Sequence, residues 1–160
     1  MSTAQRLPFL HPVSLIATWF GCGLIPIASG TWGSLGALPF AVLIVMLGGP
    51  WALLAASLLA FAVGLWASGL YAKSLGAEDP GAVVIDEVAG MWLALVPLSL
   101  DLPSYVIAFL FFRFFDIVKL WPANLMERRL KGGLGIMADD MVAGVYAAVA
   151  SLALVKLIGL

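Results

Sequence analysis

Four acidic residues of this chain form two adjacent pairs, Asp86-Glu87 and Asp139-Asp140, and each pair stands at the start of an apolar run. A carboxylate at a helix N-terminus satisfies free N–H groups and suits the helix dipole, so capping explains any one of these acids. One acid is enough for a cap, however, and both runs begin with two. Carboxylates that face one another without partners repel, and a divalent cation relieves this repulsion. Because oxygen-only ligands suit Mg²⁺ or another hard ion, the two pairs predict a metal site.

A fifth acid, Asp116, lies between two cations at helical spacing, three residues after Arg113 and three before Lys119. A ladder of opposite charges on one helix face can tolerate burial without having any function. Ionisable residues inside an apolar segment are nevertheless functional hypotheses by default, because a central charge costs about 3 kcal/mol to insert into a membrane. We expect Asp116 to complete the metal site and Arg113 or Lys119 to hold an anion.

Three further cations, Arg128, Arg129 and Lys131, occur in the sequence ERRLKGG of residues 127–133. The enrichment of Lys and Arg on the cytoplasmic side of membrane proteins is enough to explain them. The functional alternative is recognition of a phosphate or an anionic lipid headgroup beside the membrane. Nine of the seventeen charged residues lie between Arg113 and Asp140, which favours this stretch as a place of chemistry or recognition.

A glycine-rich segment, GTWGS at residues 30–34, is another candidate phosphate site. Its backbone N–H groups and the hydroxyls of Thr31 and Ser34 are groups that bind phosphate. Glycines three residues apart also allow close helix packing, so the pattern alone leaves both interpretations open.

Other catalytic chemistries find little support in the sequence. Cys22 is the single cysteine, without the x5-Arg that follows a phosphatase cysteine, and His11 is the single histidine. Neither a G-x-S-x-G nor a G-x-x-x-x-G-K-[ST] motif occurs. A net charge of −1 without a basic surplus argues against a nucleic-acid partner. Carboxylates, cations and a metal therefore remain for catalysis.

These side chains must be positioned by helices in a membrane. The chain is 63% hydrophobic and 11% charged, whereas about a quarter of a soluble domain is charged. Its length suits one domain, residues 1–160, and we expect an all-α polytopic membrane bundle. The five expected apolar spans are Leu35–Leu47, Trp51–Tyr71, Val88–Leu100, Ser104–Trp121 and Met141–Leu157. Val13–Ser29 contains glycines and a proline, and therefore predicts a broken or re-entrant segment.

Five spans place the N-terminus, residues 73–87 and residues 119–140 on one side of the membrane. That side carries most of the Lys and Arg residues and is therefore expected to be cytoplasmic. Small residues at helical spacing predict close helix packing. They form three stripes: Ala56, Ala60, Gly64, Ser68 and Ala72; Gly90 and Ala94 after Glu87; Gly144, Ala147 and Ser151 after Asp140. The last two stripes predict that the acids point towards other helices.

Three blocks of the sequence resemble the phosphatidylglycerophosphatase A family. They are Gly21–Pro39, Asp79–Trp92 and Phe112–Tyr146, in the order of the family and together nearly half of the chain. The most specific runs are Arg-x-x-Asp-x-x-Lys-x-Trp-Pro, from Arg113, and Lys-Gly-Gly-x-Gly-x-Met-x-Asp-Asp, from Lys131. The intervening residues 42–70 and the tail after residue 148 match the family only in hydrophobicity.

The resemblance implies a Mg²⁺-dependent enzyme of the bacterial inner membrane that hydrolyses phosphatidylglycerophosphate to phosphatidylglycerol and phosphate. By resemblance, the family's acidic motif positions are Asp86, Glu87, Asp116, Asp139 and Asp140. We expect these five acids to hold one or two Mg²⁺ ions at the cytoplasmic boundary, with either water or an aspartate as nucleophile. The cations near them would neutralise phosphate charge while the spans keep the acyl chains in the bilayer.

Two other classes of protein also fit part of the pattern. A small cation transporter or channel explains buried carboxylates, but it gives the basic stretch at residues 127–133 no role. Transporters also tend to place the site between repeated halves, and no internal repeat is evident here. A structural membrane subunit with packed ion pairs is the third alternative. Measurements of phosphatase activity and of ion flux distinguish the enzyme from the transporter or channel.

Overall fold

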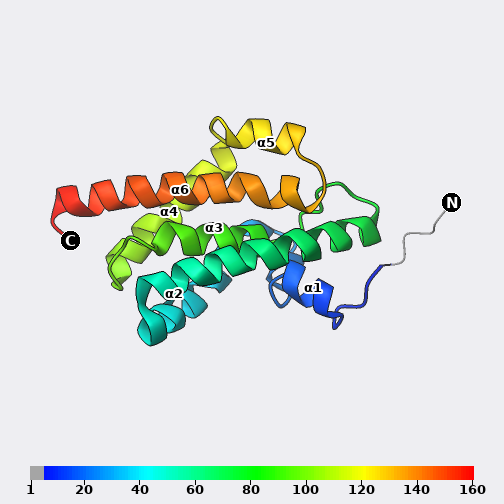
Figure 1. The fold of residues 1–160 in the computed structure, drawn as a ribbon, viewed down its shortest axis with the longest axis horizontal. Coiled ribbons are helices and arrows are strands. Elements are labelled where there is room, and N and C mark those ends of the chain that lie inside the picture. The colour runs from blue at the N-terminus through cyan, green and yellow to red at the C-terminus, as the bar shows by residue number, and fades with distance from the viewer. Residues whose placement is uncertain (1–5) are drawn as a thin grey trace.

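The computed structural model describes residues 6–160, except for the side chains of residues 126–128. The described chain is all-helical and contains no strand, as the sequence predicted. Its elements in order are α1 (Pro12–Ala17), a 3-10 turn (Cys22–Leu24), α2 (Ser29–Leu75), α3 (Ile85–Leu95), α4 (Leu102–Val118), α5 (Ala123–Arg129) and α6 (Gly133–Ile158). Figure 1 shows α2, α3 and α6 side by side as the body of the bundle, with α1 against α2 and α5 outside α6.

The N-terminal segment is broken, as predicted. His11 caps α1, because its Nδ1 accepts a hydrogen bond from the Val13 N–H at 3.2 Å. The helix stops after one and a half turns, where Trp19 and Phe20 adopt φ values of 46° and 56°. The backbone then reaches α2 through the 3-10 turn at Cys22–Leu24.

Helix α2 is a hairpin of two helical halves that correspond to the first two predicted spans. Gly49 has the non-helical angles φ 71° and ψ −171°, and Pro50 follows it. The first half contacts α3 through the Trp92 indole N–H, which donates to the Ala37 carbonyl. The second half contacts α3 one turn away, where the Ser57 hydroxyl donates to the Ala89 carbonyl. In a straight helix positions 37 and 57 would lie about 30 Å apart, so the chain reverses direction at Gly49.

Asp101 caps α4 by accepting hydrogen bonds from the Ser104 N–H and hydroxyl, which explains this acid without a catalytic role. Helix α4 ends at Val118 because Lys119 adopts φ 48°. Helices α3 and α4 are both shorter at their C-terminal ends than the predicted spans. Helix α3 ends five residues before Leu100, and α4 ends three residues before Trp121.

Residues 122–138 lie between the last two predicted spans, where a connecting loop would be expected, but most of them are helical. They contain α5 and the first six residues of α6, which begins at Gly133. The close packing of Gly133 against the Leu65 backbone leaves no room for a Cβ and places α6 against α2 at this point. Asp139 and Asp140 therefore lie in the second turn of α6 and do not cap its N-terminus, whereas Asp86 and Glu87 do lie in the first turn of α3.

Helices α2 and α6 are long and apolar enough to cross a membrane by length and composition. In the most apolar 18-residue stretch of each helix, only 11% of α2 and 28% of α6 is buried within the protein. The buried faces are made mainly of small residues: Ala37, Ala41, Ala60, Gly64, Ser68 and Ala72 on α2, and Ala143, Gly144, Ala147 and Ser151 on α6. Large apolar side chains such as Leu43, Leu59 and Val149 are exposed. Helices that pack through small residues and expose large ones are typical of membrane proteins.

Candidate metal and phosphate site

The site is built where α3 and α6 approach each other through glycine. A Cβ at Gly144 would lie 2.5 Å from the Gly90 carbonyl oxygen, and a Cβ at Gly90 would lie 2.6 Å from the Phe112 ring. Neither position can therefore carry a side chain without moving its neighbours. This contact confirms the two predicted stripes and turns the acids that precede them inwards.

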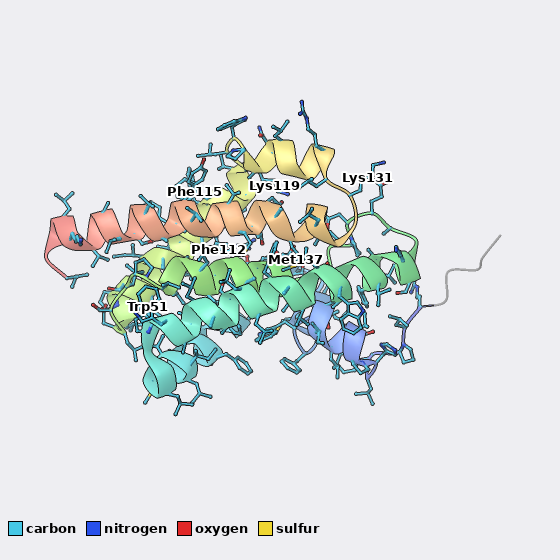
Figure 2. All side chains as sticks on the ribbon, viewed as in Figure 1. Trp51, Phe112, Phe115, Lys119, Lys131 and Met137 are labelled. Atoms are coloured by element: carbon cyan, nitrogen blue, oxygen red, sulfur yellow. The ribbon has the colours of Figure 1, made fainter. Side chains whose placement is uncertain are left out.

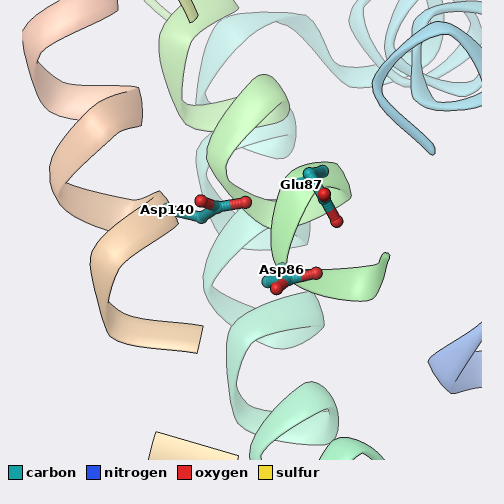
Figure 3. Close-up of side chains that lie close together, drawn as sticks. All are labelled: Asp86, Glu87 and Asp140. Carbon is teal, nitrogen blue, oxygen red and sulfur yellow. The ribbon is translucent and has the colours of Figure 1, made fainter. Parts of the chain in front are cut away.

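Three of the five predicted acids converge there. Asp86 and Glu87 from α3 and Asp140 from α6 each offer one carboxylate oxygen, and these oxygens lie within 4.8 Å of one another (Figure 3). Asp140 is only 3% exposed, and its carboxyl is within hydrogen-bonding reach of Asp116 on α4. Asp139 is also buried, at 7% exposed. Residues from three helices therefore form one acidic cluster.

The cluster contains carboxylate oxygens with unmet hydrogen-bonding capacity. Four buried oxygens have no hydrogen-bond partner within the described part of the chain: Asp86 Oδ1, Glu87 Oε2, Asp139 Oδ1 and Asp140 Oδ2. A buried polar atom without a partner costs free energy, and a buried charge costs more unless it is paired or coordinates a metal. Several hard oxygen atoms in one place match the ligand preference of Mg²⁺. The residues present thus fit the expected ion.

Two cations, Arg113 in α4 and Lys119 directly after it, pair with part of the cluster. Arg113 Nη1 lies 2.8 Å from Asp116 Oδ2 and 3.9 Å from Glu87 Oε1. Lys119 Nζ lies 2.8 Å from Asp139 Oδ2. The ion pairs therefore join α4 to both α3 and α6, in addition to the expected pair along α4. Since five acids face two cations, the cations cannot pair with all of the carboxyl groups.

The predicted phosphate-binding residues lie in two different places. Ser34 is fully buried in α2 and accepts a hydrogen bond from Arg113 Nη1 at 3.3 Å, so it joins the acidic cluster. Thr31 is half-buried one turn earlier in the same helix. Figure 2 shows Lys119 beside α6 and Lys131 at the connection from α5 to α6.

The basic stretch does not line the acidic cluster as far as its side chains are described. Arg129 and Lys131 are exposed, and the Arg128 side chain lies outside the described residues. Lys131 lines a separate cavity of about 240 Å³ together with Glu78 and Asp79. Sequence reasoning missed this cavity, although Asp79 begins one of the blocks that carry the family resemblance.

Gly30 serves close packing, which is one of the two interpretations that the sequence left open for residues 30–34. A Cβ at this position would overlap Glu87 Oε1 and lie 3.1 Å from Arg113 Nη1. The glycine spacing in residues 30–34 is the sequence feature that indicates this packing. Close packing explains the glycine at position 30 and also the one at position 33, which faces Val84.

Fold and site together define an all-helical, largely apolar protein with a buried carboxylate cluster suited to a hard cation. The chain belongs to the phosphatidylglycerophosphatase A family, whose model matches residues 15–155. It is therefore a phosphatase, as the sequence resemblance implied.

Two named relatives are similar over most of their length. Phosphatidylglycerophosphatase A of Escherichia coli (strain K12) is 42% identical over 146 residues, which cover 90% of this chain and 84% of the relative. Phosphatidylglycerophosphatase A of Haemophilus influenzae is 36% identical over 146 residues, covering 91% and 90%. No solved structure matches the chain.

Proposed function

We propose that this protein is a Mg²⁺-dependent phosphatidylglycerophosphatase that releases phosphate from the terminal phosphomonoester of phosphatidylglycerophosphate. The family and the names of the two relatives described above support the substrate. The observation that carries the proposal is the convergence of Asp86, Glu87 and Asp140, with buried oxygens that lack partners. An ion-transport role accounts for the carboxylates but not for membership of a phosphatase family.

In this proposal Asp86, Glu87 and Asp140 hold Mg²⁺, and Asp116 and Asp139 complete the acidic site beside them. When bound, the ion supplies positive charge for the phosphate oxygens and lowers the pKa of an attacking water. The chain's own task is to keep the ligand oxygens fixed and poor in solvent, which strengthens their interactions.

The cations Arg113 and Lys119 make an anionic substrate tolerable in this acidic site. Each is already within 2.8 Å of one carboxylate, and this pairing reduces the repulsion between the cluster and a phosphomonoester. The exposed Arg129 and Lys131, together with Arg128 and Thr31, are proposed to attract the headgroup at the membrane surface.

We further propose that the protein is a multi-pass protein of the bacterial inner membrane with its acidic site on the cytoplasmic side. In this proposal the two halves of α2 together with α3, α4 and α6 are the five passages through the membrane. Helix α3, with 11 residues, spans only about 16 Å, so it is buried among longer helices that face the lipid. Positive charge near the acidic end supports the orientation.

The test is phosphate release by the purified protein from phosphatidylglycerophosphate in detergent micelles, with Mg²⁺ and with a chelator. The proposal expects release with Mg²⁺, loss with chelator and recovery when Mg²⁺ is restored. Asp101→Asn serves as a matched control, because this acid caps α4 outside the cluster. Equal release in chelator would contradict the metal requirement, and release only from other phosphomonoesters would contradict the substrate.

A further inference from the structure

The Arg113 guanidinium is held between three helices. Its Nη1 contacts Ser34 on α2 at 3.3 Å, Asp116 on its own helix α4 at 2.8 Å and Glu87 on α3 at 3.9 Å. The contacts to α2 and α3 connect residues that lie far apart in the sequence. The guanidinium is therefore held by contacts to α2 and α3 in addition to Asp116 on its own helix.

The Ser34 hydroxyl is committed to an orientation that suits a cation. It donates its single proton to the Gly30 carbonyl at 2.9 Å, and the side chain is fully buried. A hydroxyl has one donor and two acceptor lone pairs, so its remaining capacity is to accept. The lone pairs are thus available to the Arg113 N–H group.

Gly30 provides the space in which the Glu87 carboxylate lies. Any Cβ at position 30 would overlap Glu87 Oε1 and press on Arg113 Nη1. Glu87 Oε1 therefore faces the first turn of α2 and the guanidinium. The other oxygen, Oε2, is buried and has no hydrogen-bond partner among the residues that the structure describes. One carboxylate oxygen is fixed by the protein while the second remains free for a ligand.

We infer that Gly30 and Ser34 are positioning residues: they fix the Arg113 guanidinium, which in turn holds Glu87 so that its Oε2 faces the cation site. This inference rests on the proposed function and differs from the phosphate contact predicted for Ser34. Outer groups that orient metal ligands have large effects, typically 10- to 100-fold in metal affinity or activity.

The test compares Ser34→Ala with Ser68→Ala. Ser68 is also fully buried in α2 and donates to the carbonyl four residues earlier, Gly64, but within the described part of the chain no arginine hydrogen-bonds to it. Mn²⁺ binding to the detergent-purified proteins is measured by electron paramagnetic resonance of the free ion. Ser34→Ala is expected to raise the Kd for Mn²⁺ about tenfold, and Ser68→Ala is expected to leave it at the wild-type value.

Kinetics separate positioning from substrate contact. For Ser34→Ala the Mg²⁺ concentration for half-maximal phosphate release should rise about tenfold, while the KM for the lipid at saturating Mg²⁺ stays unchanged. A raised lipid KM with unchanged Mn²⁺ binding would show that Ser34 contacts substrate and would overturn the inference. Equal loss of Mn²⁺ binding in both serine variants would also overturn it, because a general packing defect would then be the cause.

A second variant tests the same geometry if Ser34→Ala does not fold. Gly30→Ala is expected to weaken Mn²⁺ binding, whereas Gly81→Ala, whose Cβ meets open space, should not. Wild-type affinity in Gly30→Ala would contradict the inference alone. A wild-type protein that hydrolyses the lipid without binding Mn²⁺ or Mg²⁺ would contradict the metal site itself, and the inference with it.

Discussion

Replacing Gly144 by alanine should separate α3 from α6 and damage the site from a distance. A Cβ at position 144 would lie 2.5 Å from the Gly90 carbonyl oxygen, and ordinary contact begins at 3.4 Å, so the helices must part by about 0.9 Å. The atoms nearest to the new methyl group all belong to the Gly90 backbone, which cannot rotate away as a side chain would. Asp140 is four residues from Gly144, on the same face of α6, so its carboxylate moves with the helix.

The functional cost exceeds the structural cost. Overpacking of this kind destabilises a core by about 1–3 kcal/mol, whereas a misplacement of about 1 Å at a reacting centre can reduce the rate about 100-fold. Gly144→Ala is therefore expected to keep its helical circular dichroism and lose about 99% of its Mg²⁺-dependent phosphate release. Gly81→Ala is the control with open space around the new methyl group. Wild-type activity in Gly144→Ala would refute the argument that glycine contact sets the site.

Three further outcomes follow from the ion pair, the helix cap and the acids. Lys119→Met leaves the buried Asp139 without its 2.8 Å partner, so the thermal unfolding midpoint of the protein in detergent should fall. Adding Asp139→Asn should restore the midpoint but not the activity. An unchanged midpoint in the single variant would contradict this expectation. Asp101→Ala removes the α4 cap and should lower stability by about 0.5–2 kcal/mol with activity retained; lost activity in a folded variant contradicts this. Asp140→Asn should abolish phosphate release while the protein stays folded, and full activity would remove Asp140 from the metal site.

Much of the fold could be predicted because its causes are local. Composition indicated the helical class, and the break between the predicted spans Leu35–Leu47 and Trp51–Tyr71 indicated where α2 reverses. The spacing of Gly90 after Glu87 and of Gly144 after Asp140 indicated which face of each helix is packed, so the acids were expected to point towards other helices. Each of these features depends on residues close together in the sequence.

The errors have tertiary causes. Residues 132–138 are rich in glycine and lie outside the predicted spans, the last of which begins at Met141. In the structure α6 already begins at Gly133, where this residue packs against the Leu65 backbone. Similarly, the bond between Ser34 and Arg113 joins residues 79 positions apart and depends on side-chain orientation. Spacing alone could not distinguish a serine that binds phosphate from one that orients an arginine.

The position of a bound cation tests the central claim most directly. Crystals of the protein soaked in MnCl₂ would be examined for anomalous scattering from Mn²⁺, which shares the oxygen preference of Mg²⁺. The account predicts a peak bonded to one oxygen each of Asp86, Glu87 and Asp140. A peak elsewhere, or none in crystals of a protein that is active with Mn²⁺, would contradict it.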